Sequence, residues 1–305
     1  MRPGEPAAGQ RWPDLLAEAW AALVRAVLCR GGVKQMRADA DEAVRRFAAE
    51  GIMAPIAALC QGLARILSGD LDGGDASFAD AVVIATDAGA PEGLAEALSE
   101  RSLVAMARGN WSRAEVLAEQ ARSTLREAGI EDSYATTLVC AAQARVAQHR
   151  GDIQTARQHL ASAQRTRPML TYALPHMAVQ ARIELIRVHL ALGDLAGART
   201  LIQEVDELLR RRPGLGNLVD EARAFRDRLA SEHGSSAPGA SSLTAAELRL
   251  LPMLSTHLSF AEIAAELFLS RHTISSQAMS IYRKLGVGSR SNAVARCREL
   301  GLLEG

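Results

Sequence analysis

Apolar residues recur at helical spacing over two stretches of the chain. The first stretch, residues 14–230, is rich in Ala, Leu and Arg and has almost no clusters of β-branched residues, which favours helices over strands. The second stretch, residues 243–305, combines helical periodicity with three closely spaced signals for helix starts. Together the two patterns predict an all-α protein built in two parts.

Gly-Asp or Gly-Asn pairs recur within the first stretch at nearly constant spacing. The pairs begin at Gly69, Gly109, Gly151 and Gly193, which lie 40, 42 and 42 residues apart. In the last three copies an alanine follows at the same offset, at Ala114, Ala156 and Ala198. Glycine can take the left-handed conformation that ends one helix, and Asp or Asn can cap the next. The small alanine then lets the two helices cross closely, so each copy predicts the turn of a helix pair.

An earlier, degenerate copy of this turn is expected at Gly31-Gly32. Five helix pairs and a terminal helix near residues 215–230 are therefore predicted, and the terminal helix can serve as the polar cap that a repeat array requires. The repeats resemble a tetratricopeptide-like superhelix with long repeats, and an irregular helical bundle is the alternative. Such an array presents a concave surface to a peptide, a protein or a small-molecule effector.

Composition changes at both ends of this region. Residues 231–242 shift to Ser, Gly, Pro and Ala, which predicts a flexible linker. Residues 1–13 begin with a Pro/Gly/Ala-rich run without the order of a signal peptide, and we expect them to be disordered. The predicted domains are thus a disordered N-terminus (1–13), a helical repeat domain (14–230), a linker (231–242) and a C-terminal domain (243–305).

The C-terminal domain is predicted to hold four short helices. Its start signals are the capping boxes Thr244/Glu247 and Ser259/Glu262 and the single N-cap residue Ser270. Gly286 should end the third helix, and a fourth should run over residues 289–300 and close at Gly301.

The third of these helices divides into two faces. Its apolar positions are Ile274, Ala278, Ile281 and Leu285. Its other side carries Arg271, His272, Ser275, Ser276, Met279, Tyr282 and Arg283. A helix that reads DNA needs this division, because one face packs on its scaffold while the other meets bases and phosphates in the major groove. Its N-terminal amides can also bind a phosphate.

Motifs spread over residues 243–303 resemble the LuxR-type helix-turn-helix DNA-binding domain. They are Leu243-Thr244-x-x-Glu247, Glu262-Ile263-Ala264, Leu269-Ser270-x-x-Thr273-Ile274, Ile281-Tyr282-Arg283-Lys284-Leu285-Gly286-Val287 and Ser289-Arg290-x-x-Ala293-Val294. The resemblance implies that the third helix enters the major groove of double-stranded DNA and that helix 289–300 pairs two subunits as a homodimer. Tetratricopeptide-like arrays precede such domains in MalT-like regulators, and this chain resembles the C-terminal part of those regulators.

The resemblance also implies roles for single residues. Residues that would face bases are Ser275, Ser276 and Met279. Residues that would hold backbone phosphates are Ser270, Arg271, Thr273, Tyr282 and Lys284. His272 and Arg283 complete the predicted DNA-binding set, while Arg290 is expected to form a salt bridge within the domain. The family usually has Lys at Ser275 and often His at Gln277, and a lost bidentate contact is worth on the order of 1–3 kcal/mol.

The net charge of the C-terminal domain limits how strongly one copy can bind DNA. The formal net charge of the whole chain is zero, but seven basic and five acidic side chains in residues 243–305 give this part +2. A single copy should therefore bind DNA weakly and lose affinity with salt, and a dimer doubles the basic patch.

Enzyme and metal signatures are missing from the sequence. The four cysteines, Cys29, Cys60, Cys140 and Cys297, have no metal-type or paired spacing, and the seven histidines form no HExxH pair. No apolar run approaches the roughly 20 residues that span a bilayer. No phosphate-binding G-x-x-x-x-G-K-[ST] loop and no G-x-S-x-G motif occur. We therefore expect a cytoplasmic protein that is not an enzyme, uses no cofactor or metal and has no contact with a membrane.

The hypothesis from the sequence is a sequence-specific transcription regulator whose repeat domain senses a protein or small-molecule effector. Two alternatives remain open. One is a protein-interaction scaffold with a degenerate DNA-binding domain, an interpretation that rests on Ser275 and Gln277. The other is the C-terminal part of a split signalling ATPase that acts with a nucleotide-binding partner chain.

Overall fold

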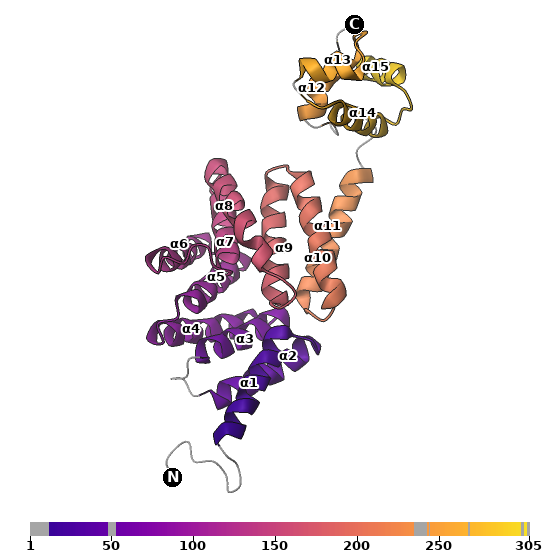
Figure 1. The fold of residues 1–305 in the computed structure, drawn as a ribbon. Coiled ribbons are helices and arrows are strands. Elements are labelled where there is room, and N and C mark those ends of the chain that lie inside the picture. The colour runs from indigo at the N-terminus through magenta and orange to yellow at the C-terminus, as the bar shows by residue number, and fades with distance from the viewer. Residues whose placement is uncertain are drawn as a thin grey trace. The chain divides into compact units, whose positions relative to one another are not determined.

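The computed structural model describes residues 12–47, 53–234, 243, 245–267, 269–299 and 302–303, and within these ranges the chain is helical without a strand. It divides into two compact units between Asp227 and Arg228, and each unit is considered by itself. The prediction of an all-α fold is confirmed for the described residues (Figure 1).

The first unit consists of five helix pairs and one further helix. The pairs are α1 (Trp12–Leu28) with α2 (Gly32–Arg46), α3 (Ala54–Leu67) with α4 (Leu71–Asp87), α5 (Pro91–Ala107) with α6 (Trp111–Glu127), α7 (Thr136–His149) with α8 (Ile153–Thr166), and α9 (Pro175–Ala191) with α10 (Leu195–Arg211). A short 3-10 turn, η1 (Arg167–Met169), follows α8, and α11 (Asn217–Gly234) follows the fifth pair. The boundary between the units falls within α11, after Asp227. The five predicted pairs and the terminal helix are thus confirmed.

The limits of this region differ slightly from the prediction. Helix α1 begins at Trp12, inside the segment expected to be disordered, and α11 continues to Gly234, four residues into the segment expected to be a linker. Residues 1–11 and 235–242 lie outside the described residues.

The repeated Gly-Asp and Gly-Asn turns have the predicted geometry. Gly69, Gly109, Gly151 and Gly193 all have φ between +73° and +89°. The residue after each glycine caps the next helix: Asp70 accepts from the amide of Gly73 (2.9 Å), Asn110 from Arg113 (3.1 Å), Asp152 from Thr155 (3.0 Å) and Asp194 from Gly197 (2.9 Å). The following alanines Ala114, Ala156 and Ala198 are fully buried where the helices cross.

Odd-numbered helices form the inner layer of the first unit. Each contacts the next odd-numbered helix, from α1 through α3, α5 and α7 to α9, as well as its own even-numbered partner. Helix α9 is buried on nearly all sides, whereas α10 buries a single stripe of Ala198, Leu201, Ile202, Val205, Leu208 and Leu209. The inner layer therefore encloses side chains that an isolated amphipathic helix would leave in water.

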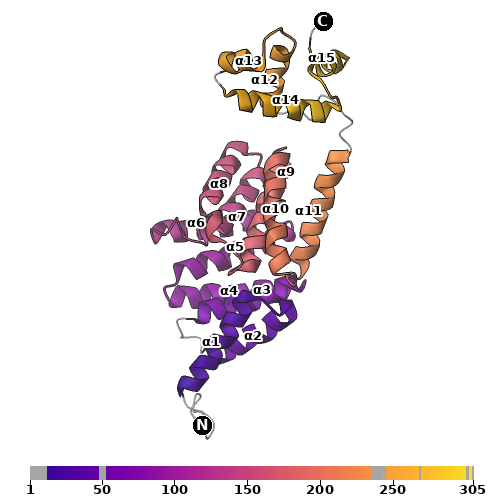
Figure 2. The ribbon, with the colours of Figure 1, turned by 45° about the vertical axis from the view of Figure 1, so that its right-hand side comes forward.

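The segment between α10 and α11 returns to the first two repeats. We call residues 212–217 the return segment. Three N–H···O hydrogen bonds tie it to these repeats: Val33 N donates to the Gly214 carbonyl (3.1 Å), Arg212 Nε to the Leu28 carbonyl (3.0 Å) and Asn217 Nδ2 to the Ile66 carbonyl (3.2 Å). The Cys29 thiol also donates to the Gly214 carbonyl at 4.0 Å. Figure 1 and Figure 2 both show this turn beside α2 and α3. The segment after the last helix pair is therefore bonded to the first and second pairs, and this joint closes the array.

The second unit contains the four helices expected from the sequence. They are α12 (Ala245–Leu254), α13 (Phe260–Glu266), α14 (Arg271–Leu285) and α15 (Arg290–Glu299). The capping box of Ser259 and Glu262 is present, Ser270 caps α14, and Gly286 ends it with φ +70°. The predicted cap Thr244 and the predicted stop Gly301 lie outside the described residues.

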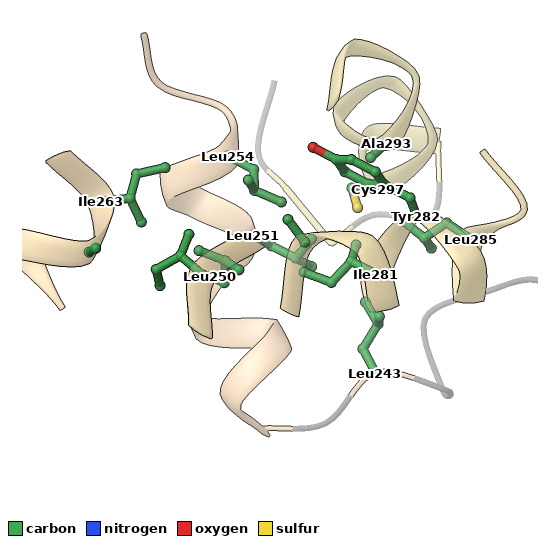
Figure 3. Packing of buried hydrophobic residues seen from close by; sticks show 13 residues of the cluster. Leu243, Leu250, Leu251, Leu254, Ile263, Ile281, Tyr282, Leu285, Ala293 and Cys297 are labelled. Carbon is green, nitrogen blue, oxygen red and sulfur yellow. The ribbon is translucent and has the colours of Figure 1, made fainter. Parts of the chain in front are cut away.

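One apolar core holds these helices together (Figure 3). Its buried members are Leu243, Leu250, Leu251, Leu254, Ile263, Ala264, Ile274, Ala278, Ile281, Tyr282, Leu285, Ala293 and Cys297. All four helices contribute, so the exposed side of each helix is set by this core. Across the described parts of the chain, we find no helix with the length and apolar character needed to cross a bilayer.

Candidate nucleic-acid interface

Helix α14 is held in place by its apolar side, which packs on the other three helices of the second unit. Its apolar stripe is fully buried at Ile274, Ala278 and Ile281 and nearly so at Leu285. The helix contacts α12, α13 and α15. Because three neighbours hold this stripe, the orientation of the opposite side is set by packing rather than by its own polar residues.

The three residues expected to face bases reach the surface of the unit. Met279 is 61% exposed, Ser276 is exposed and Ser275 is half-buried. A methionine this exposed contributes little to the core, and its thioether chain offers an apolar contact on an otherwise hydrophilic face.

Basic side chains lie at both ends of the same face. Arg271 and His272 are exposed in the first turn of α14, and Arg283 is exposed in the last. Neither guanidinium group forms a hydrogen bond or ion pair with another described residue. At 3.6 residues per turn the three basic residues and Ser275, Ser276 and Met279 fall within an arc of roughly 140°. Six of the predicted residues thus share one exposed face.

Ser270 and Thr273 are occupied with the start of the helix. Ser270 Oγ accepts from the Thr273 amide at 3.0 Å and lies 2.8 Å from Thr273 Oγ1. Both hydroxyls thereby hold the N-terminal turn of α14 in place. Ser270 is exposed and Thr273 is half-buried.

Tyr282 does not lie on the exposed face, and that part of the sequence prediction is wrong. The residue is only 7% exposed and belongs to the core shown in Figure 3. Its hydroxyl has no hydrogen-bond partner among the described residues, and burial raises the pKa of this phenol. Tyr282 lies next to the apolar stripe on α14, and its ring is therefore buried in the core.

Lys284 is also turned away from the exposed face. Its Nζ lies 2.6 Å from Glu247 Oε2 on α12, and Glu247 is only 4% exposed. The sequence placed Lys284 among the residues that hold phosphates. In the structure its charge balances a buried carboxylate, so its first role is to join α14 to α12.

We expect Lys284→Met to destabilise the second unit by about 1–3 kcal/mol, because the buried Glu247 carboxylate loses an ionic partner while the aliphatic chain is kept. Hydrogen exchange of amides in α12 and α14 of the full chain measures the effect. The matched control is Glu299→Gln, which removes the exposed pair with Arg296 and should change stability by less than about 0.5 kcal/mol. Equal protection in the two variants would show that the Lys284 pair is dispensable.

Arg290 organises the segment between α12 and α13. Its guanidinium donates to four backbone carbonyls: Leu254 (2.8 Å), Leu258 (2.6 Å), Thr256 (2.8 Å) and Met253 (3.1 Å). The sequence analysis placed Arg290 within the domain but assigned it a salt bridge. It binds carbonyls instead, because the C-terminal turn of a helix leaves carbonyl groups without intrahelical donors. The sequence analysis missed this role. The carbonyls that Arg290 binds lie 32 to 37 residues away in the sequence, so an arginine at the start of α15 was the only local sign of it.

Comparison with known proteins gives one family. The family model described as "MalT-like TPR region" matches residues 17–304. No curated protein matches the chain. A crystal structure of BtubC (BKLC) from P. vanneervenii is 16% identical, with 66% of this chain and 88% of that chain covered, at a TM-score of 0.41. Because the family model covers nearly the whole length of the sequence, the chain belongs to the family of MalT-like TPR regions.

Proposed function

We propose that the protein is a sequence-specific DNA-binding regulator of transcription and that α14 binds in the major groove. The observation that carries this proposal is the exposed face of α14, on which two arginines, whose guanidinium groups have no partner among the described residues, flank small polar side chains and an exposed methionine. A B-DNA major groove is about 12 Å wide and admits one helix. The resemblance of residues 243–303 to LuxR-type domains supports the same docking.

Each residue of the face has a role in this proposal. Arg271 and Arg283 bind phosphates on the two sides of the groove, where their positions about 18 Å apart along the helix suit contacts with different strands. Ser276 and Ser275 hydrogen-bond to base edges, and Met279 contacts a thymine methyl. The free amides at the start of α14 attract a further phosphate.

Two copies bind DNA together in this proposal. The net charge of +2 in residues 243–305 gives one copy little attraction for phosphate. Helix α15, whose Ser291, Ala295 and Arg298 are exposed, pairs two copies as a homodimer. Half-sites are then centred about 10 base pairs apart.

The repeat array controls this module by binding a protein or small-molecule effector, and the chain itself is not an enzyme. We place the protein in the cytoplasm, because its four cysteines are free thiols and all are buried, which suits a reducing compartment.

A selection of bound duplexes from a random library by the full chain tests the proposal, followed by affinity measurements at two salt concentrations. Ser276→Glu should lower the affinity for the selected duplex about 100-fold, or about 2.7 kcal/mol, since it places a carboxylate against the phosphates. Gln154→Glu is the matched control, because it adds the same charge at an exposed position of α8 and should leave binding unchanged. Absence of salt-sensitive binding to any duplex, or equal binding by the two variants, would refute the proposal.

A further inference from the structure

A cavity of about 140 Å³ lies inside the first unit where α1, α3, α5 and α9 face one another. Its apolar lining includes Leu59 and Leu63 of α3 and Met177 of α9. Its polar lining consists mainly of Glu96 of α5, Tyr134 before α7 and His176 of α9. A dry cavity of about 150 Å³ in another protein holds benzene, so this space suits a body of one ring or a short alkyl chain.

Two polar side chains of this lining have polar atoms without a partner among the described residues. Glu96 is 6% exposed and makes no hydrogen bond or ion pair with any residue that the structure describes. His176 is 3% exposed, and its buried Nδ1 is likewise without a hydrogen-bond partner in the described ranges. Buried polar groups are nearly always hydrogen-bonded. Other buried acids of the same unit have partners: Glu184 pairs with Arg145, and Glu100 accepts from Gln180 through Oε2, although its Oε1 has none in the described ranges.

The ionisable groups that act on Glu96 most strongly are other carboxyl groups. Burial, followed by the neighbouring carboxyl groups of Glu100 and Glu92, raises the pKa of Glu96 to about 8. Burial also raises the pKa of Glu100 to about 8 and lowers that of His176 to about 4. Once ionised, these carboxyl groups repel an anion and attract a cation, and the neutral imidazole of His176 can accept a hydrogen bond.

The lining of the cavity favours an organic cation. Among the described side chains, no group of three or more His, Cys, Asp and Glu residues is placed to hold a metal ion. The apolar walls instead favour a molecule that buries a hydrocarbon body beside its charge.

We propose that this cavity binds a small primary or secondary amine that carries a short alkyl chain or a single aromatic ring. The ammonium donates hydrogen bonds to the Glu96 carboxylate and to His176, and the hydrocarbon body packs against Leu59, Leu63 and Met177. As the effector site of the repeat array, this inference rests on the proposed function, although binding in the cavity does not require it. The ligand contacts the second, third and fifth helix pairs at once and therefore stabilises the closed array.

Amine binding in the cavity should become tighter as the pH rises from 6 to 8. Glu96 faces Glu92 and Glu100 on its own helix, Cys60 on α3, Tyr134 before α7 and His176 on α9. Because its folded pKa is raised to about 8, Glu96 holds a proton at pH 7 and must release it when the ammonium binds. Alkylamines stay protonated over this range, so the affinity should rise by up to tenfold per pH unit from pH 6 and level off near pH 8.

Calorimetric titration of the full chain at pH 8 tests the proposal with benzylamine and hexylamine as probes and benzyl alcohol and hexanol as neutral counterparts. At least one amine should bind about tenfold more tightly than its alcohol. Glu96→Gln should remove that preference, and Glu115→Gln, which changes a half-buried residue of α6 outside the cavity, should keep it. The comparison of amine with alcohol and the pH series both use the unmodified chain, so they remain decisive if Glu96→Gln does not fold.

Three results would overturn the inference: no probe amine binds, the alcohols bind as tightly as the amines, or folded Glu96→Gln keeps the preference. These outcomes are separable from those of the DNA experiment. A chain that binds a duplex but no amine contradicts only the cavity proposal, and a chain that binds an amine but no duplex contradicts only the regulatory function.

Discussion

Replacing Arg290 by lysine should destabilise the second unit by about 2–4 kcal/mol, although the charge is kept. A planar guanidinium reaches four carbonyls between α12 and α13 at once, and a single ammonium cannot reproduce that geometry. Each lost hydrogen bond to a charged donor costs about 1.5–3 kcal/mol, partly recovered by water at this half-buried site. A unit of about 60 residues has a total stability of roughly 3–9 kcal/mol, so the loss is a large part of it.

Hydrogen exchange of the full chain measures this effect in peptides that cover α12 and α13. Arg298→Lys is the matched control, because Arg298 is exposed on the same helix, α15, and makes no hydrogen bond to another described residue. We expect normal protection in Arg298→Lys and strongly reduced protection in Arg290→Lys. If both variants exchange like the parent protein, the carbonyl contacts do not hold the domain together.

The second large effect is expected at Gly216 in the return segment. This residue has φ +56°, and a Cβ added to it would lie 2.0 Å from the Leu67 carbonyl oxygen. Alanine would therefore combine a strained backbone with a clash against a second backbone segment that cannot rotate away. We expect Gly216→Ala to destabilise the first unit by about 3–5 kcal/mol, which is at the upper end for a single substitution.

Gly193 provides the control for this substitution. Its φ of +73° imposes the same backbone strain, but a Cβ there would meet nothing within 4 Å. Gly193→Ala should therefore cost only about 1 kcal/mol. Denaturant unfolding of both variants isolates the cost of the close approach, and equal midpoints would mean that the return segment moves aside without penalty.

Features that depend on neighbouring residues could be predicted from the sequence. The glycine, the Asp or Asn cap and the following alanine of each repeat are local requirements, and they gave the number of helix pairs and the place of each turn. The capping box of Ser259 and the stop at Gly286 are local in the same sense. The exposure of Ser276 and Met279 followed from the period of the apolar stripe on α14.

Features that depend on residues far apart in the sequence could not be predicted from it. Lys284 looks like a surface cation until Glu247 of α12 is placed 2.6 Å away. Glu92, Glu96 and Glu100 recur at four-residue spacing, which is typical of a solvated helix face, yet the enclosed inner layer buries Glu96 and Glu100. No sequence pattern relates Gly214 to Gly32, although a Cβ on Gly214 would lie 2.8 Å from the Gly32 Cα.

Closure by the return segment limits how this array can vary. In an open solenoid each repeat contacts only its neighbours, so copies can be gained or lost and the ends can fray separately. Here the fifth helix pair leads directly into backbone that is bonded to the first and second. Insertion or deletion of one pair would move residues 212–217 away from their hydrogen-bond partners in the first and second pairs, so the number of repeats cannot change without breaking these bonds. For the same reason we expect the five pairs to unfold in a single cooperative transition.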